Sequence, residues 1–268
     1  MNRAGSIVVF ALIACLAAAD TPVSPSQRKA SKAEQRIFYL LNQERELAGL
    51  VKLAWSEQAA QAARAHAILL AEHGELSHQF PGELSLRERL ASTTVRFTSA
   101  AENIALADNE DEAHLALMYS QGHRENILNE SYSAAGVGVV ERAGRLYVTQ
   151  DFIRLVPVYG EEEFRAALAK AFNRARESKG MKAVLVQKDS ALHDAACSTG
   201  GDAVALPAKV GFSGEMVVFT LSEPDQLPAE LLKWASSARV SRMDIGVCFR
   251  PDAEHGNGNF WVVAAFAM

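Results

Sequence analysis

The sequence lacks several features that would point to common functions. It has no cluster of Lys or Arg, and its formal net charge of −5 and pI of about 5.8 argue against nucleic acid as the main partner. No apolar run after residue 20 is long enough to cross a bilayer. None of the serines lies in a GxSxG nucleophile elbow, so no serine nucleophile can be named.

The first 19 residues are typical of an export signal. Arg3 supplies the positive start, residues 6–16 form the apolar run, and residues 17–19 are three alanines that suit a cleavage site. An alternative is a lipoprotein signal that ends before Cys15, because Leu-Ile-Ala-Cys has the form of a lipobox. Cys15 would then be lipidated and hold the protein on a membrane. Both alternatives stay open at this point.

Either signal predicts an extracytoplasmic protein that is secreted, periplasmic or lipid-anchored to the envelope. Residues 20–32 begin with turn-forming residues and are expected to be a linker. Outside the cytoplasm thiols can oxidise, and Cys197 and Cys248 remain as an even pair. The pair predicts one possible disulfide, and the alternative is two small buried apolar side chains.

A repeat divides the mature chain in two. Residues 41–67 align without a gap on residues 172–198, at an offset of 173 − 42 = 131. Each copy predicts an amphipathic helix that ends at a glycine able to adopt the left-handed conformation, followed by a short extended run and a second helix. The identical pairs are Asn42 and Asn173, Arg45 and Arg176, Glu46 and Glu177, and Gly49 and Gly180.

Both copies also end alike. Residues 135–152 predict two strands around Ala143-Gly144, and residues 244–266 predict two strands around a longer loop. Helices followed by an antiparallel hairpin indicate an α+β layered domain. We therefore expect two such domains in tandem, at residues 33–156 and 157–268. Ser31 and Glu34 are expected to form a capping box at the start of the first helix.

Six ordered segments resemble the CAP superfamily of cysteine-rich secretory, antigen 5 and pathogenesis-related proteins, in its short bacterial form. The resemblance implies a three-layer α-β-α sandwich with an antiparallel central sheet, present twice in tandem. The segments are LLNQERELAGLVKLAW at 40–55, LSH ending at His78, AENIA at 101–105, SQGHRENIL at 120–128, AGVGVV at 135–140 and RLYVTQDF at 145–152.

The resemblance also implies a groove with two histidines and two acidic residues, which in some members binds zinc or another divalent ion. The matching positions here are His78, Glu102 and His123, while the fourth, acidic position is Ser120. Three ligands and one open position suit a weak or catalytic metal site. The alternative is a polar pocket whose groups satisfy one another. Further polar residues expected beside the groove are Asn103, Arg124 and Asn126.

The second copy is expected to be degenerate. In its alignment on the first, Glu215 falls on Glu102, but Val240 falls on His123. No histidine between residues 198 and 250 can replace His78. In the first copy His66, His73 and His114 lie on predicted helices, and they are expected at the surface or its edge rather than in a site.

Two functions remain from the sequence. The first is binding of an unidentified lipid, glycan or envelope protein in the groove around His78, Glu102 and His123. The alternative is a metal-dependent envelope hydrolase, in which a cation held by the two histidines activates water and Glu102 moves the proton. An enzyme is the weaker expectation, because the sequence offers no nucleophile or pair of oxyanion donors. A structural module without a ligand is a third possibility.

Overall fold

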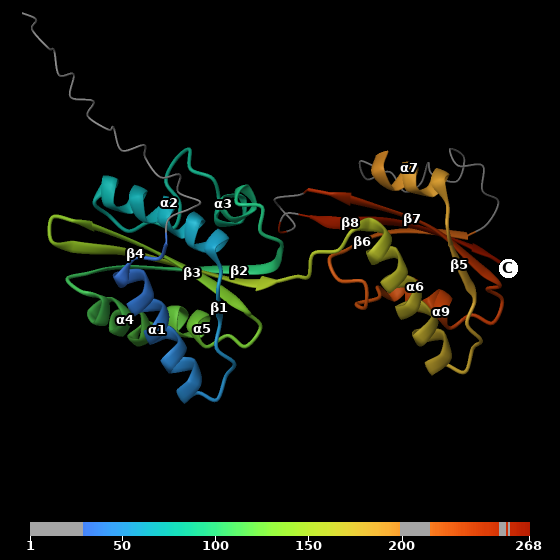
Figure 1. Cartoon of the computed structure of the whole chain (residues 1–268), viewed down its shortest axis with the longest axis horizontal. Helices are drawn as coiled ribbons and strands as arrows, with labels where there is room; N and C mark the ends of the chain where they lie inside the picture. Colours follow the sequence, from blue (N-terminus) through green and yellow to red (C-terminus); the bar gives the residue numbers. More distant parts are fainter. Residues whose placement is uncertain (1–28, 199–214, 252–255, 257) are drawn as a thin grey trace, which may run out of the picture.

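The computed structural model describes residues 29–198, 215–251, 256 and 258–268. The predicted signal, Cys15 and most of the predicted linker lie outside the described residues. The described chain forms two four-stranded sheets, each with helices on both faces (Figure 1). Within the described residues, no helix has the length and apolar character needed to cross a membrane.

The elements follow the same general order in the two halves. In the first half they are α1 (Lys32–Leu47), β1 (Ala54–Trp55), α2 (Glu57–His73), α3 (Leu86–Ser92), β2 (Phe97–Ala107), α4 (Glu110–Tyr119), α5 (Gln121–Ile127), β3 (Ala134–Arg142) and β4 (Arg145–Leu155). In the second half they are α6 (Glu161–Ser178), β5 (Leu185–Lys188), α7 (Ser190–Ser198), β6 (Glu215–Leu221), α9 (Ala229–Ala235), β7 (Arg242–Arg250) and β8 (Asn259–Ala267).

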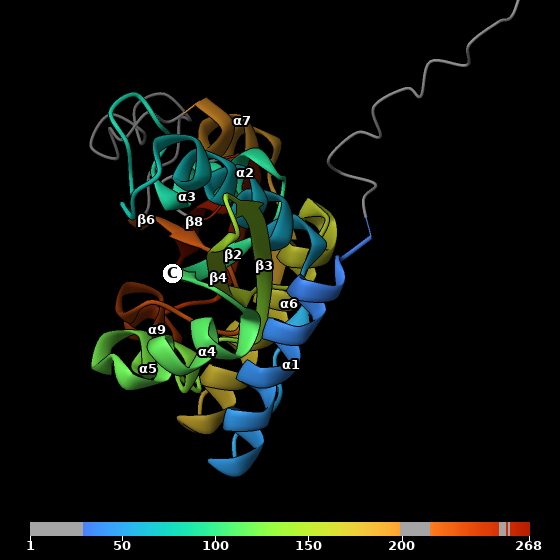
Figure 2. The ribbon, with the colours of Figure 1, turned by 90° about the vertical axis from the view of Figure 1, so that its left-hand side faces the viewer.

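Each half is a three-layer α-β-α sandwich. The strand orders are β1-β3-β4-β2 and β5-β7-β8-β6, so corresponding strands occupy corresponding places. In the first half α2 and α3 cover one face of the sheet, and α1, α4 and α5 cover the other (Figure 2). The long strands pair antiparallel as predicted, but β1 pairs parallel with β3 and β5 pairs parallel with β7. In each half the chain between the two paired strands contains helices, and this provides the long crossover that parallel pairing needs.

The repeated asparagine and arginine make equivalent bonds in the two halves. Asn42 exchanges hydrogen bonds with the backbone of Leu53 at 3.1 and 2.8 Å, and Asn173 does so with Val184 at 3.0 Å in both directions. Arg45 is 1% exposed and donates to three backbone carbonyls, including that of Ile127 at 2.8 Å. The buried guanidinium thereby connects the end of α1 to the end of α5 and to the chain just after it.

Glycines permit two features that both halves share. Gly49 and Gly180 each follow a helix with φ of +73°, the left-handed conformation that the sequence predicts. Gly136 on β3 lies so close to α2 that an added Cβ would meet the backbone of Ala60 at 1.9 Å. Gly246 on β7 has the same relation to α7, where a Cβ would lie 2.1 Å from the backbone of Leu192.

Candidate functional site

Glu102 is the centre of the polar site in the first half. It lies in the middle of β2, where its side chain is only 3% exposed. The loop between α2 and α3 brings His78 to it, and Nδ1 of His78 lies 2.9 Å from Oε1 of Glu102. The His78 side chain is 60% exposed. The site therefore combines a solvent-facing imidazole with a buried carboxylate beneath it.

His123 reaches the same region from α5, on the opposite side of β2. Asn103, the neighbour of Glu102, donates from Nδ2 to the backbone oxygen of His123 at 3.0 Å. Asn126 donates to Oδ1 of Asn103 at 2.9 Å and lies 3.5 Å from the backbone oxygen of Glu102. These amide bonds fasten α5 to the strand that carries Glu102. Asn103 and Asn126 thus position the predicted histidine.

Two predicted members do not join this arrangement. Ser120 lies between α4 and α5, and its side chain makes no capping hydrogen bond to α5. Arg124 is exposed on α5, where Nη1 lies 3.5 Å from the backbone oxygen of Met118. Neither side chain makes a hydrogen bond to Glu102, His78 or His123 among the interactions of the described residues.

Arg89 is a member of the site that the sequence analysis missed. It lies on α3, is 5% exposed, and donates from Nη2 to Oε2 of Glu102 through a very short contact. Its Nη1 donates to Oε1 of Glu83 at 3.0 Å. Charge-assisted bonds of this kind are stronger than neutral ones. Both oxygens of Glu102 are therefore engaged, one by His78 and the other by Arg89.

His66 contradicts the expectation of a surface position. It is completely buried on α2, with Nδ1 2.6 Å from Oε1 of Glu83 and Nε2 2.9 Å from the backbone oxygen of Ser77. Nε2 also lies 3.8 Å from Oε1 of Glu102. His114 is buried as well, because α4 packs it against α1, whereas His73 is exposed. A helix places one side against the core, and His66 lies on that side.

Asp151 faces Glu102 across the pairing of β4 with β2. It is completely buried, and neither carboxyl oxygen has a hydrogen-bond donor within the described part of the chain. Burial first, and then the negative charge of Glu102, raise the pKa of Asp151 well above its usual range. A protonated Asp151 can donate its own proton to Glu102, which supplies the donor that two ionised carboxylates would lack.

The two site histidines have pKa values shifted in opposite directions. The hydrogen bond to Glu102 raises the pKa of His78. Burial lowers the pKa of His123, and the neighbouring charge of His78 lowers it further. The two shifts therefore make the His78 ring easier to protonate than the His123 ring.

The second half keeps the framework without this set of groups. Glu215 begins β6 and is exposed, in contrast to the buried Glu102. The predicted alignment of these two residues is wrong by one position, because Met216 pairs with Ala265 where Glu102 pairs with Asp151. Val240, which aligns with His123, is buried in the segment before β7. The structure has no helix between Ser236 and Ser241, so the described second half has no counterpart of α5. Its Arg176 donates instead to backbone carbonyls in this segment, including that of Ser237 at 3.0 Å.

The donor set does not suit a divalent metal as it is arranged. Within the described residues, no three His, Cys, Asp or Glu side chains are grouped so that they could hold an ion. Glu102 is bound to the Arg89 guanidinium, whose positive charge opposes a second cation at the same carboxylate. Two imidazoles then remain from the predicted trio, fewer than the three protein ligands of a catalytic zinc site. Zinc binding by His78, His123 and Glu102 stays a prediction.

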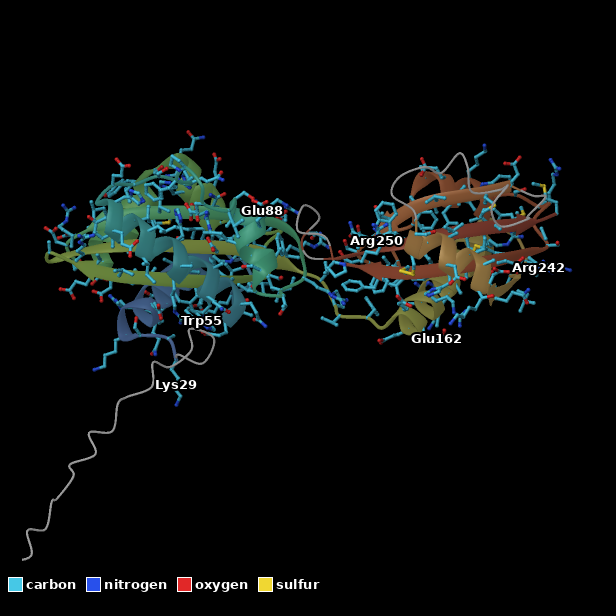
Figure 3. The ribbon with its side chains drawn as sticks, turned by 90° about the horizontal axis from the view of Figure 1, so that it is seen from above. Lys29, Trp55, Glu88, Glu162, Arg242 and Arg250 are labelled. Atoms are coloured by element: carbon cyan, nitrogen blue, oxygen red, sulfur yellow. A yellow bond between two sulfur atoms is a disulfide. The ribbon has the colours of Figure 1, made fainter. Side chains whose placement is uncertain are left out.

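Two cavities lie near these elements. One of about 250 Å³ opens between α2 and α3 and includes Glu83 and Arg89 in its wall. The other, of about 430 Å³, lies against α1 and β1 and is lined by Phe38, Tyr39 and Trp55. Figure 3 labels Trp55 in the first half. The polar site and the aromatic pocket are therefore built from different residues.

A family model matches the first half, and known proteins match about half of the chain. A model of the cysteine-rich secretory protein family, CAP, matches residues 38–152. An uncharacterized membrane protein of Bacillus subtilis strain 168, YlbC, is 37% identical over 123 residues, and the uncharacterized protein YkwD of the same strain is 36% identical over 124. Each alignment covers 46% of this chain, but only 34% of YlbC and 48% of YkwD.

A solved structure matches over a similar share of the chain. It is an extracellular protein with an SCP domain from Bacillus anthracis strain Ames, with 38% sequence identity and a TM-score of 0.42. The match covers 46% of this chain and 40% of that one. The family motifs, the sandwich fold and the family model agree on the same segment. Residues 38–152 thus belong to the CAP superfamily, the family of the cysteine-rich secretory proteins.

Proposed function

We propose that the protein is an extracytoplasmic binding protein whose first half receives a polar, hydroxyl-rich ligand of the glycan class at His78, Glu102 and His123. The observation that carries this proposal is the arrangement of Glu102. Arg89 and His78 bind its two oxygens, and Asp151 is paired with it on the neighbouring strand β4. A carboxylate fixed in this way keeps the exposed imidazole of His78 in one orientation, which lowers the entropic cost of binding.

The groups around His78 favour a polar ligand over a lipid. The side chains of Gln79 and Arg124 are exposed along with His78, and His123 and Asn126 are half-buried. Such groups donate and accept hydrogen bonds, whereas a bound acyl chain needs apolar walls. The imidazoles, amides and guanidinium together provide both donors and acceptors, as sugar hydroxyl groups require.

Calorimetry with glycan fragments released from bacterial cell walls by a muramidase tests the proposal. His78→Ala and His123→Ala are each expected to weaken binding about tenfold or more, because each removes a hydrogen bond to the ligand. His193→Ala, which removes an imidazole from the second half, is the matched control and should bind as the wild type does. Equal affinity in all four proteins would contradict the proposal.

The aromatic pocket supports a second candidate function, binding of an apolar ligand. Phe38 and Trp55 form an edge-to-face pair with ring centroids 5.1 Å apart, and Tyr39 completes the wall. The nearby amides are already bonded, since Asn42 binds Leu53 and Gln43 donates to the Tyr39 hydroxyl at 2.8 Å. The pocket therefore offers aromatic surface beside amides that are already paired, which suits an apolar ligand.

A fluorescent fatty acid separates the two candidates. If the apolar candidate holds, Trp55→Ala should lose binding and His123→Ala should keep it. Tyr119→Ala removes an exposed ring outside the pocket and serves as the control. Binding that is unaffected by Trp55→Ala would exclude the aromatic pocket as the lipid site.

A further inference from the structure

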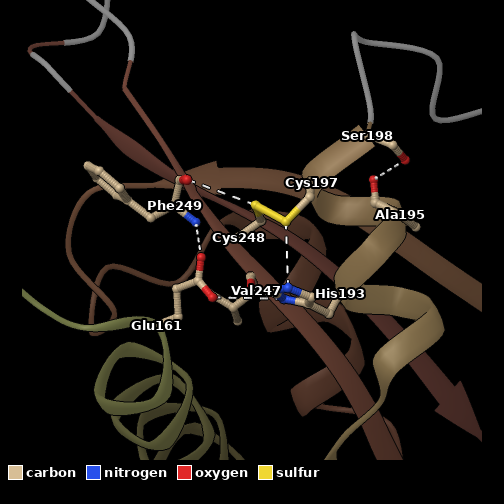
Figure 4. The surroundings of a disulfide bond; sticks show 8 residues. All are labelled: Glu161, His193, Ala195, Cys197, Ser198, Val247, Cys248 and Phe249. Carbon is tan, nitrogen blue, oxygen red and sulfur yellow. Dashed lines mark hydrogen bonds and ion pairs between the residues drawn. A yellow bond between two sulfur atoms is a disulfide. The ribbon is translucent and has the colours of Figure 1, made fainter.

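A disulfide in the second half lies in an unusual chemical setting. It joins Cys197, at the end of α7, to Cys248 on β7, 51 residues later in the chain (Figure 4). Cys197 is exposed, whereas Cys248 is only 6% exposed. An incoming reagent therefore meets Cys197 more readily than Cys248. Attack on this bond is directed to Cys197.

His193 lies one helical turn before Cys197, and its Nε2 is 3.7 Å from the Cys197 sulfur. Its other nitrogen, Nδ1, is 2.7 Å from the backbone oxygen of Val247. A carbonyl only accepts hydrogen bonds, so the hydrogen of the neutral ring belongs on Nδ1. The unprotonated Nε2 then faces the sulfur of Cys197, where it can act as a base.

Glu161 extends this line of groups. It is the first residue of α6, and its Oε2 lies 3.9 Å from Nδ1 of His193. Its other oxygen accepts a hydrogen bond from the backbone nitrogen of Phe249 at 2.9 Å, which holds the carboxylate in place. A sulfur, an imidazole and a carboxylate thus follow one another, the order that activates a thiol in cysteine nucleophiles. A positive charge formed on His193 would be balanced by Glu161.

We propose that the Cys197–Cys248 bond is an exchangeable disulfide, in which Cys197 is the sulfur that reacts with external thiols and His193 serves as its base. A cavity of about 190 Å³ is lined by His193 together with charged groups of both signs, including Glu162 and Lys188. It provides room for a small charged thiol next to the histidine. The site lies entirely in the second half and does not depend on ligand binding by the first.

The exchange with a dithiol balances in two steps. In the first, one thiolate attacks the Cys197 sulfur, the Cys197–Cys248 bond breaks, and its electron pair leaves on Cys248, which takes a proton. In the second, the other thiolate of the reagent attacks its own sulfur in the mixed disulfide. Cys197 leaves as a thiolate beside His193, whose Nε2 accepts the second proton. The dithiol loses two electrons and the protein disulfide gains them.

Reduction of the native full-length protein by dithiothreitol tests whether the bond exchanges in the folded state. Samples taken over time are alkylated and the two cysteines are counted by mass spectrometry. The rate is expected to remain constant as urea is raised to concentrations that leave the protein folded. A rate that rises in proportion to the unfolded fraction would overturn the proposal, because the bond would then react only after unfolding.

Alkylation of the reduced protein at pH 7 tests the role of His193. Cys197 is expected to react with iodoacetamide about tenfold faster than Cys248, and His193→Gln should slow Cys197 several-fold by removing the base. Glu161→Gln should slow it less. His73→Gln, on an exposed histidine of the first half, is the control. Equal rates for Cys197 in wild type and His193→Gln would overturn the role of His193.

A second variant allows the role of His193 to be tested without reduction of the protein. Cys248→Ser leaves Cys197 as a free thiol without any reductant, and circular dichroism reports whether the fold is retained. Adding His193→Gln to this variant is expected to slow alkylation of Cys197 by the same factor as in the reduced protein. If Cys248→Ser is folded and its Cys197 alkylates at the same rate with and without His193→Gln, the proposal fails.

Discussion

Arg45 and Arg176 make the same kind of bonds in the two halves, but Glu102 and its charged partners belong to the first half alone. The shared bonds tie helices to backbone carbonyls, so they serve any sandwich of this shape. The buried carboxylates, by contrast, need Arg89 and the histidines around them, and in the second half Met216 stands in the strand position of Glu102 while Glu215 is exposed. The comparison separates residues that maintain the fold from residues that form a site.

Removing the shared arginine should have the largest effect in either half. Arg45→Leu leaves the carbonyls of Val51, Ile127 and Asn129 without their donor. We expect the free energy of unfolding to fall by about 3 kcal/mol or more, measured by urea denaturation. Arg176→Leu should have a similar effect on the second half. Arg174→Leu, at an exposed neighbouring position, is the control. A similar loss there would contradict the role of the buried arginines in holding the fold.

Replacing Glu102 or Glu215 should distinguish the halves. Glu102→Gln removes the partner of the buried Arg89 guanidinium, and we expect a loss of about 2 to 4 kcal/mol in the free energy of unfolding. Glu215→Gln changes an exposed side chain and should alter it by less than about 0.5 kcal/mol. Thermal and urea unfolding measure both. A loss for Glu102→Gln as small as that for Glu215→Gln would show that the buried network adds nothing to stability.

Asp151→Asn should be tolerated despite complete burial. Because the pKa of Asp151 is raised in the folded state, its contribution to stability is complete below the ordinary aspartate pKa and is lost as the pH rises through the raised value. At pH 7 the neutral amide should keep the free energy of unfolding within about 1 kcal/mol of the wild type, or increase it. A loss at pH 7 as large as that of Glu102→Gln would contradict a protonated Asp151.

That pH dependence offers a second readout. Between the ordinary carboxyl pKa and the raised one, the wild type should lose stability with rising pH more steeply than Asp151→Asn does. Urea unfolding at a series of pH values gives both slopes. Parallel slopes would mean that Asp151 titrates alike in the folded and unfolded chains.

The smallest expected effects concern the histidines themselves. His78→Gln should change the free energy of unfolding by less than about 1 kcal/mol, because its side chain is largely exposed and its ion pair is screened by solvent. In an NMR titration, the His78 ring should titrate above the usual histidine pKa and the His123 ring below it. The reverse order would contradict the bond between His78 and Glu102.

Local features of the fold could be predicted from the sequence. The capping box of Ser31 and Glu34 is present, with bonds of 3.1 and 2.7 Å. The glycine turns at Gly49 and Gly180 and the hairpin at Ala143 also form as expected. Each depends on residues a few positions apart, so the sequence carries its full signal.

The residues around Glu102 that the motifs did not indicate are Arg89, His66 and Asp151. They come from distant segments of the chain. A signal for His66 existed, since it lies seven residues after Ala59 and four before Leu70 on the buried face of α2. For Asp151, the apolar residues on both sides of it in β4, at 146–148 and 152–153, indicate a buried strand in spite of the polar run at 149–151. Neither pattern shows that His66 and Asp151 lie next to Glu102. Their positions depend on the packing of α2 and on the register of β2 with β4.

The most direct measurement of the polar site is a spectrum of the seven histidine rings during addition of the wall-derived glycan fragments to isotopically labelled protein. The signals of His78 and His123 are predicted to shift together and to saturate at one ligand concentration, while that of His193 stays unchanged. Binding detected by calorimetry without any shift at His78 and His123, or with a shift at His193 instead, would contradict a ligand site in the first half.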